Sequence, residues 1–358
     1  MNTKEKSPEF SQVSDSKNLS QLIRSNAPEY WAYMKAHADL RLLKPYLEFE
    51  GTVAGDPHLG NFGPIPVMTS AGSRKMRFVN IDFDDAGRAP FVLDFVRYLA
   101  AIKAQCKPMK SEVLQENYVL GLRGKSVPPP NTVQEFLEMK VSDYDKRAAQ
   151  YCEKHCRGDS FKFKAGEIDS YQGPISAEVI GRLFPGEQVF CVAKRVEARG
   201  GSSDEARIWV LVGGPHSRQR IMELKQYAAP GTARYQPQPP VKRWLAEIRQ
   251  AFWPGLTGAD YDLVEIKGGG LFWIREKRVP LIDIPYSSEK KHDVEFVMSL
   301  AIYDANVLGL AHGTQAQGAA YYAAIHRAPE AFHHASKEVA LAYLESARQA
   351  FKKKKSQQ

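Results

Sequence analysis

Two short segments in the first quarter of the chain concentrate carboxylate and amide side chains. The first is Gly55-Asp56-Pro57-His58-Leu59-Gly60-Asn61, and the second is Ile81-Asp82-Phe83-Asp84-Asp85. Phosphoryl transfer needs a carboxylate beside the attacking hydroxyl group and oxygen ligands for the Mg²⁺ that neutralises the phosphates. The spacing therefore predicts a phosphotransfer site in which Asp56 is the base and Asn61 and Asp82 bind the metal ion.

The same residue types also occur in ordinary turns, where Asp and Asn side chains bond the local backbone. Turn chemistry alone does not account for two carboxylate clusters on either side of an apolar strand, followed by a helix that carries Asp94. We therefore interpret the segments as a functional site with Asp84 and Asp94 in supporting roles. His58 has two interpretations: a structural histidine that holds the loop through its ring nitrogens, which is favoured, or a catalytic group.

The composition is that of an ordinary globular protein with a modest basic excess. The chain has 358 residues, 43% of them hydrophobic, and a formal net charge of +8. The positive charge suits a polyanionic ligand. The phosphates of a nucleotide would meet this requirement as well as a nucleic acid would, and nucleic-acid binding is not expected. The lysine run at 352–355 is typical of a solvated tail.

The sequence predicts a cytoplasmic location without membrane contact. It has no continuous run of about 18–20 apolar residues and no apolar signal-peptide core near its start. Four cysteines are few for this length, which fits a reducing compartment. Cys152 and Cys156, with His155 between them, have the residue types of a zinc site, but no second pair with suitable spacing follows. The oligomeric state is left open.

Helices and short strands are expected around the two motifs. Helical periodicity covers residues 29–43, and a strand at 48–53 leads into the first motif. A second strand-like run at 78–83 precedes a helix with a continuous apolar stripe at 91–103. Three consecutive prolines then separate this region from helical segments at about 133–156.

Beyond residue 185 the pattern changes from helices to strands. Three strands of an antiparallel meander are expected at 189–196, 207–212 and 220–227. A helix at 241–252 and a hairpin at 261–276 follow, with glycines at the turn of the hairpin. From residue 292 onward the pattern is helical.

The motif residues resemble a known family. The segments that carry the resemblance are Gly55-Asp56-Pro57-His58-Leu59-Gly60-Asn61-Phe62-Gly63, Asp82-Phe83-Asp84-Asp85-Ala86 and Pro90-Phe91-x-x-Asp94. They resemble the bacterial domain of unknown function 2252 family, itself similar to aminoglycoside and choline phosphotransferases of the protein-kinase-like superfamily. The resemblance extends more weakly from about residue 45 onward.

By this resemblance Asp56 matches the catalytic-loop aspartate, Asn61 the metal-binding asparagine and Asp82 the first residue of the metal-binding DFG motif. The sequence departs from the pattern at two positions. Ala54 stands where many such phosphotransferases have His, and Asp84 stands at the glycine position of DFG.

The order of the segments predicts a circular permutation. The resemblance implies an ATP-gripping β-lobe, yet the residues before Asp56 contain no Gly-rich hairpin and no lysine-bearing strand. Residues 189–276 supply these parts in the right internal order. The helix that ends near His312 resembles the one that leads into the catalytic loop of ordinary kinases, so linking it to the strand at 48–53 would restore the usual order.

Four residues are assigned to nucleotide binding on this basis. Lys225 would reach the ATP phosphates, provided that Glu223 shares its face of the strand, and Glu247 on the next helix would steady it. Gly200 and Gly201 would form the turn that covers the phosphates. Each assignment has a simpler alternative: an exposed strand lysine, a solvated helix face and an ordinary hairpin turn.

The predicted fold is therefore α+β, a two-lobed, circularly permuted protein-kinase-like fold. Its expected parts are a flexible leader (1–25), the catalytic-loop half of the helical lobe (26–185), a β-rich ATP-gripping lobe (186–285), helices that complete the helical lobe (286–351) and a basic tail (352–358). The expected function is ATP- and Mg²⁺-dependent phosphotransfer to a small hydroxyl- or amine-bearing acceptor. Alternatives are a nucleotide-binding regulatory module without activity, an AMP transferase and a metal-dependent hydrolase, although the last would be expected to have more histidines near the motif.

Overall fold

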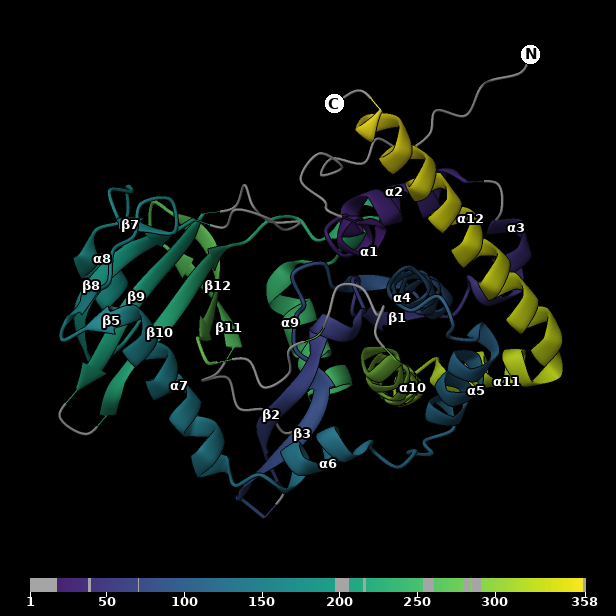
Figure 1. The fold of residues 1–358 in the computed structure, drawn as a ribbon, viewed down its shortest axis with the longest axis horizontal. Coiled ribbons are helices and arrows are strands. Elements are labelled where there is room, and N and C mark those ends of the chain that lie inside the picture. The colour runs from purple at the N-terminus through teal and green to yellow at the C-terminus, as the bar shows by residue number, and fades with distance from the viewer. Residues whose placement is uncertain are drawn as a thin grey trace.

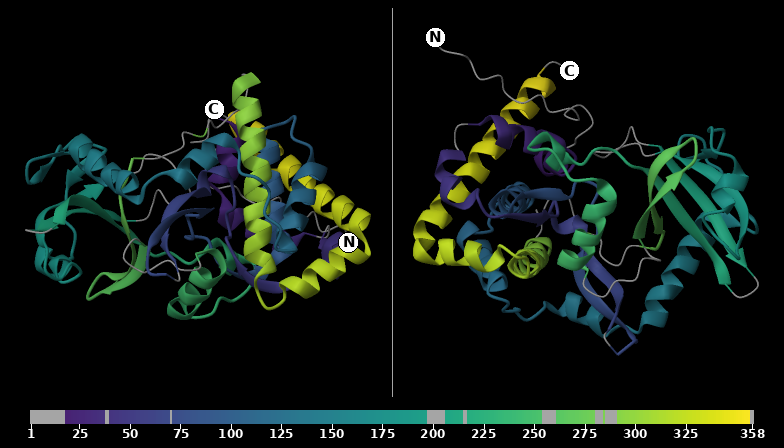
Figure 2. Two further views of the ribbon diagram at one scale, coloured as in Figure 1. Left: turned by 90° about the horizontal axis from the view of Figure 1, so that it is seen from below. Right: turned by 180° about the vertical axis from the view of Figure 1, so that it is seen from behind.

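The computed structural model describes residues 18–37, 40–69, 71–196, 206–214, 217–253, 261–279, 284 and 291–356. The chain is an α+β protein. A six-stranded antiparallel sheet lies at one end and most of the helices lie at the other (Figures 1 and 2). We call these parts the sheet half and the helical half.

The helical half begins with a series of helices and two small β-ladders. Its elements in chain order are α1 (Leu19–Arg24), α2 (Ala27–Ala36), α3 (Leu40–Leu43), the 3-10 helix η1 (Lys44–Tyr46), β1 (Glu50–Val53), the 3-10 helix η2 (Leu59–Asn61), β2 (Phe62–Met68), β3 (Arg74–Asn80), β4 (Gly87–Pro90), α4 (Phe91–Gln105) and α5 (Ser111–Leu122). The helices α6 (Asn131–Glu138) and α7 (Val141–His155) then lead to the sheet.

The sheet half contains six strands in the order β11-β12-β10-β9-β8-β7. The part of the chain that forms this sheet contains, in order, β5 (Cys156–Arg157), β6 (Ser160–Phe161), β7 (Ile168–Ser170), α8 (Ala177–Gly181), β8 (Gln188–Arg195), β9 (Arg207–Gly214), β10 (Ser217–Gln226), the 3-10 helix η3 (Gly231–Arg234), α9 (Val241–Phe252), β11 (Tyr261–Ile266) and β12 (Gly270–Glu276). Within this part η3 and α9 pack against the helical half. The predicted meander is β8-β9-β10, and the predicted hairpin β11-β12 joins the same sheet through β12.

Side chains alternate between the two faces of β10, as the pleat of a strand requires. Met222 and Leu224 pack into an apolar cluster together with residues around α8. Ile221 is buried on the opposite face in a cluster with residues of α7, and Glu223 and Lys225 share that face by alternation. The condition that the sequence set for Lys225, a common face with Glu223, is therefore met.

The chain returns to the helical half in α10 (Lys291–Gly313), α11 (Gly318–Arg327) and α12 (Pro329–Lys355). The central helix of this half is α4, of which 13 of 15 residues are buried, and it packs against α1, α10 and α12. Among these buried residues are the polar Asp94 and Arg97. Because an unpaired charge is costly in such a place, both must find partners.

One segment of α10, Val294–Gly313, is long and apolar enough by composition to cross a membrane. Half of it is buried inside the fold, and α10 packs against α5, α4 and α11. The same pattern is produced by a core helix of a globular protein, and these contacts are of that kind.

The structure corrects the expected start of the ordered chain. Residues 19–24 form α1, whereas the sequence predicts a flexible leader through residue 25. Leu22 and Ile23 are fully buried, and the Asn18 side chain accepts a hydrogen bond from the backbone N–H of Gln21. A short apolar pair and a capping residue are therefore sufficient to dock this helix once α4 and α12 provide a surface.

Candidate functional site

Two β-ladders bring the motif loops together. In one ladder β1 pairs with β4, and in the other β2 pairs with β3, with Phe62 opposite Asn80. The loop of residues 54–61 therefore leaves β1 and enters β2, while the loop of residues 81–86 leaves β3 and enters β4. The backbone N–H of Ile81 donates to the carbonyl of Asn61 at 2.7 Å. The two loops consequently lie side by side.

The two loops also approach each other closely at Gly55. Its φ of +81° lies in the left-handed region, and a Cβ at this position would lie 1.9 Å from the carbonyl oxygen of Asp85. The indole Nε1–H of Trp31 donates to the Gly55 carbonyl at 2.7 Å. A side chain at position 55 would push the loops apart, so this position requires glycine.

The buried carboxylate of Asp94 on α4 fixes the backbone of the loop of residues 54–61. Its Oδ1 accepts a hydrogen bond from Gly55 N–H at 2.8 Å, and its Oδ2 accepts one from Ala54 N–H at 3.0 Å. The ring Nε2 of His312 lies 3.2 Å from Oδ2. One buried carboxylate thus orders the backbone immediately before Asp56 and connects it to the end of α10.

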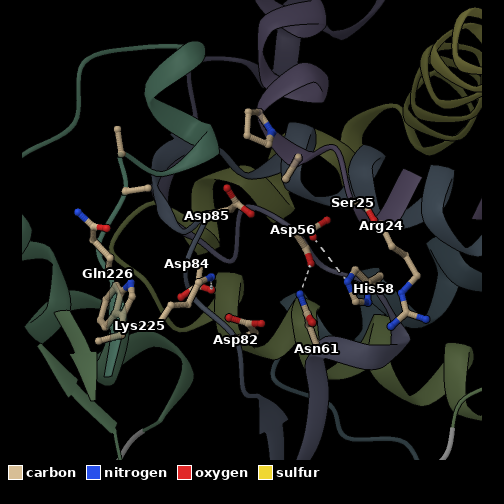
Figure 3. A pocket seen from close by; sticks show the side chains of 15 residues that line it. Arg24, Ser25, Asp56, His58, Asn61, Asp82, Asp84, Asp85, Lys225 and Gln226 are labelled. Atoms are coloured by element: carbon tan, nitrogen blue, oxygen red, sulfur yellow. Dashed lines mark hydrogen bonds and ion pairs between the residues drawn. The ribbon is translucent and has the colours of Figure 1, made fainter. Parts of the chain in front are cut away.

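A pocket of about 210 Å³ opens where the motif loops face the end of β10 (Figure 3). It is lined by Arg24, Ser25, Ala27, Pro28, Asp56, His58, Asn61, Asp82, Asp84, Asp85, Lys225, Gln226, Ala228, Ala229 and Trp273. Six of the residues that the sequence assigns to the site are in this set. Asp94 is not among the lining residues, but it bonds the backbone that leads to Asp56.

Asp56 is paired with an arginine inside the helical half. The Nε–H and an Nη2–H of Arg97 both donate to Asp56 Oδ1, at 2.9 and 2.6 Å, and Arg97 is fully buried. Burial raises the pKa of Asp56, although the charges of Arg97 and Arg24 oppose this increase. The second carboxylate oxygen, Oδ2, is the one that lies toward His58.

The contacts of His58 define its tautomer and its role. Its Nδ1 accepts a hydrogen bond from Gly60 N–H at 3.0 Å, so in the neutral ring the proton is on Nε2, 3.5 Å from Asp56 Oδ2. Burial, together with the charges of Arg24 and Arg97, holds the pKa of His58 well below its usual range. His58 is therefore a neutral ring that orders the loop and faces the carboxylate.

Asn61 and Asp82 provide oxygen atoms that fit a hard divalent cation. The amide of Asn61 donates to the Asp56 carbonyl at 2.9 Å, which leaves its Oδ1 as an available ligand. Asp82 Oδ1 is buried and has no hydrogen-bond partner within the described part of the chain. Burial and the charge of Asp84 raise the pKa of Asp82 to about 6. An orphaned buried carboxylate oxygen is the kind of group that a cation would satisfy.

The described residues contain no group of three or more His, Cys, Asp or Glu side chains arranged to hold a metal ion. A Mg²⁺ at this position would therefore be shared between one or two protein ligands, water and phosphate oxygens, which is its usual mode of binding. Cys152 and Cys156 likewise do not belong to such a group.

Lys225 connects the sheet half to the second motif loop. It is buried, and its ammonium group contacts the carboxylate of Asp84. Burial by itself would raise the pKa of Asp84, but Lys225 and Arg275 outweigh burial and lower it. Asp84, at the position where DFG has glycine, is thus the carboxylate that meets the lysine.

Asp85 fastens the same loop to the segment that follows β10. Its Oδ1 accepts a hydrogen bond from Gly231 N–H at 2.9 Å, at the start of η3. Burial, followed by the charges of Asp56 and Asp84, raises the pKa of Asp85 to about 8. This carboxyl group therefore holds η3 where it packs against α2 and β4.

Glu223 organises the cations on the face of the sheet that carries Lys225. This fully buried carboxylate lies 2.8 Å from Arg275, 3.4 Å from Lys277 and 3.5 Å from Arg207, and it accepts a hydrogen bond from Trp209 Nε1–H at 3.0 Å. Burial alone would raise the pKa of Glu223, but the three cations outweigh burial and hold the pKa well below its usual range.

One of the predicted nucleotide-binding residues, Glu247, is not brought to the pocket. Glu247 is half-buried on α9, its carboxylate lies 3.6 Å from Arg243, and it is not among the described residues that line the pocket. The helix α9 packs against β1, β4 and α10, which belong to the helical half. Gly200 and Gly201 lie outside the described residues.

Sequence reasoning missed two arginines at the site. Arg97 interrupts the apolar run Phe95-Val96-Arg97-Tyr98-Leu99, and a charge on an otherwise apolar helix was the available signal. Arg24 lies in the segment predicted to be a flexible leader. Its signal was the spacing of Leu19, Leu22 and Ile23 around it, which is that of a short helix.

Comparison with known proteins gives one partial match. A family model described as an uncharacterized protein conserved in bacteria (DUF2252) matches residues 33–112. The matched segment includes both motif loops and Asp94, and it covers less than a quarter of the chain. It supports the resemblance to this family of unknown function. No curated protein and no solved structure gives a significant match.

Proposed function

We propose that this chain is an ATP- and Mg²⁺-dependent phosphotransferase with a circularly permuted, kinase-like organisation, acting on a small-molecule acceptor. One observation carries the proposal: Asp56, Asn61 and Asp82 from the motif loops line the same pocket as Lys225 from β10. A base, two oxygen ligands for a cation and a lysine for phosphates are the parts that phosphoryl transfer needs.

Each of these residues has a distinct proposed task. Lys225 would bind the phosphates of the nucleotide, and Asn61 and Asp82 would hold Mg²⁺. When bound, the Mg²⁺ ion would neutralise the charge of the phosphates. Asp56 would orient the acceptor hydroxyl and take its proton through Oδ2, because Arg97 occupies Oδ1 and fixes the direction of the carboxylate.

Two features support the permuted arrangement. From β8 to β12 the chain contains, in order, two strands, a lysine-bearing strand, the helix α9 and a hairpin, and the lysine-bearing β10 lies between β9 and β12. The segment after α10 lies along β1: the Gln315 side chain accepts from Thr52 N–H at 2.7 Å and donates to the Thr52 carbonyl at 2.8 Å. In an unpermuted chain this segment would continue into β1.

The Arg97–Asp56 pair also favours a second candidate, a nucleotide-binding regulatory module with little or no activity. A carboxylate held by a buried guanidinium is a weaker proton acceptor than one without that partner. AMP transfer would use the same residues and differs in its product. A metal-dependent hydrolase has less support, because the described residues contain no cluster suited to hold a metal ion without phosphate.

The proposal is tested by nucleotide binding and turnover. ATP should raise the melting temperature only when Mg²⁺ is present, and Asp82→Asn should weaken this effect. Asp56→Asn should preserve most of the shift and lower turnover by about 10²–10⁴-fold. Exposed Asp159 provides the control variant Asp159→Asn, which should change neither quantity.

Wild-type protein that shows no Mg²⁺-dependent shift with ATP would contradict the proposal. A shift without turnover in a metabolite extract would favour the regulatory module. Mass spectrometry of the products distinguishes an added phosphoryl group from an added AMP group.

A further inference from the structure

Three of the four cysteines lie close together against the sheet, and none of them lines the pocket that the proposed function uses. Cys152 and Cys156 are buried in one apolar cluster with residues of β8, β9 and β10, and the partly buried Cys191 of β8 packs against the same cluster. Cys106 is buried in a different apolar cluster, at the end of α4. The proposed function assigns no role to these thiols.

Cys152 and Cys156 are one helical turn apart at the end of α7, where the chain enters the sheet half (Figure 1). Cys156 is the C-cap residue of α7, and its backbone N–H donates to the carbonyl of Cys152. Two Cα atoms separated by such a turn are about 6 Å apart. This distance is within the range of about 4.4–6.8 Å that a disulfide spans. The backbone therefore places the two residues at a separation suited to a disulfide.

The two side chains also face each other, because their thiols share a hydrogen bond. This hydrogen bond lowers the pKa of Cys152, and the same hydrogen bond, together with burial, raises the pKa of Cys156. The thiolate is the nucleophilic form of cysteine. Cys152 is therefore the attacking thiol of the pair, and Cys156 is the thiol that keeps its proton.

The neighbours of the pair do not complete a metal site. The part of the chain that the structure describes contains no group of three or more His, Cys, Asp or Glu side chains arranged to hold a metal ion. The Sγ of Cys191 lies 3.9 Å from the hydroxyl of Ser160, and the ring of His155 packs against Tyr151 and Trp209. The chemistry that remains for two adjacent thiols is oxidation.

We propose that Cys152 and Cys156 are a redox modification site and form a reversible disulfide with hydrogen peroxide as the oxidant. The Cys152 thiolate attacks one peroxide oxygen, the O–O bond breaks, and a sulfenic acid forms while the released hydroxide takes up a proton to become water. The sulfur of Cys156 then attacks the sulfur of Cys152, the S–O bond breaks, and the hydroxyl group leaves as water with the Cys156 proton. Two thiols are oxidised to one disulfide, and one peroxide is reduced to two molecules of water. This reaction does not depend on the proposed function.

Disulfide mapping of the wild-type protein tests the proposal. Reduced full-length protein is treated with hydrogen peroxide, alkylated in denaturant and digested with trypsin without reduction. Trypsin cleaves between the two cysteines, after Lys154, so a disulfide joins the peptides 148–154 and 155–157. Mass spectrometry should find this linked pair about 2 Da below the summed mass of the two thiol peptides, and dithiothreitol should separate it.

The same measurement names the results that would overturn the proposal. A disulfide from either residue to Cys191 would do so, as would sulfinic acid at Cys152 without a disulfide, or full alkylation of both thiols after peroxide treatment. Cys106 is the internal control, because it has no cysteine in its cluster and should be recovered in alkylated form.

Single variants test the role of each thiol. In Cys156→Ala peroxide should convert Cys152 to sulfinic acid, about 32 Da heavier, because no second thiol traps the sulfenic acid. In Cys152→Ala the thiol of Cys156 should remain alkylatable, and the matched control Cys191→Ala should form the disulfide as the wild type does. Equal oxidation of the remaining thiol in the first two variants would contradict the assigned roles. The wild-type mapping needs no substitution and decides the proposal even where a variant does not fold.

Discussion

The motif loops and the face of β10, which meet at the pocket, are constructed in different ways. The motif loops are close in sequence, and their Asp56, which is mostly buried, pairs with the fully buried Arg97 of α4. On the face of β10, residues from separate strands come together, and the carboxylate of Glu223 forms ion pairs with three partly exposed cations. The motif loops depend on one pair whose guanidinium is fully buried, whereas Glu223 shares its charge among several cations that water also reaches.

This difference predicts how each region responds to mutation. Removing one member of a buried pair leaves the other charge without compensation, which is costly. Removing the centre of a partly solvated group costs less, because the cations that remain can be hydrated. Arg97→Met and Glu223→Gln examine this contrast directly, and substitutions of other charged residues follow, from the largest expected effect to the smallest.

Arg97→Met should have the largest effect. We expect the free energy of unfolding to fall by about 3–5 kcal/mol, because Asp56 would remain buried without its counter-charge. Urea unfolding followed by circular dichroism measures the change. The double variant Arg97→Met with Asp56→Asn should recover part of the loss. A double variant no more stable than Arg97→Met alone would show that the charge on Asp56 is not the cause.

Glu223→Gln should lower the free energy of unfolding by about 2–3 kcal/mol at neutral pH, because three cations lose their shared carboxylate. The pKa of Glu223 in the folded protein is held below its unfolded value. Its ionised form therefore stabilises the fold above about pH 4.5, and this contribution is lost as the pH falls. The stability difference between wild type and variant should therefore shrink progressively as the pH falls below about 4.5, and a difference that stays constant in acid would contradict this account.

Asp304→Asn should be stabilising, by about 1–2 kcal/mol at pH 7. Asp304 is fully buried on α10, and its carboxylate oxygens have no hydrogen-bond partner in the described part of the chain. Burial raises the pKa of Asp304 well above its usual range, so its cost to stability grows as the pH rises above about 4. The gain in the variant should therefore be larger at pH 7 than at pH 4, and equal gains would refute this explanation.

Glu247→Gln should have the smallest effect. Its side chain is 36% exposed and pairs with Arg243 one helical turn away, so we expect less than about 0.5 kcal/mol in stability and unchanged ATP binding. Loss of ATP binding in Glu247→Gln would favour the pairing with Lys225 that the sequence suggested.

Lys225→Met should weaken ATP binding in the same thermal-shift assay, because the variant lacks the ammonium group that is proposed to bind the phosphates.

The sequence predicted most elements of the fold because their patterns are local. The strands at β8, β9 and β10, the helix α9 and the hairpin β11-β12 follow from alternating or helical periodicity within short segments. The short strand β7 was missed, because three residues carry almost no periodic signal. The helix α1 was missed because its stability comes from docking on α4 and α12 and not from its own length.

The motif loops could also be identified from sequence, because their geometry is determined over a few residues. Gly55 needs a left-handed backbone, His58 bonds Gly60, and Asn61 bonds the carbonyl of Asp56. Such contacts between near neighbours leave their residue types in the sequence at a fixed spacing.

Only the tertiary structure decided which charges meet. The sequence proposed Glu247 for Lys225 from the order of elements, but α9 packs on the helical half and Asp84 meets the lysine instead. No partner for Asp56 was predicted from the sequence. In the structure Arg97, about one helical turn after Asp94 on α4, forms an ion pair with it. Ion pairs between residues that are distant in sequence depend on how whole helices and strands pack. No short segment of the sequence determines that packing.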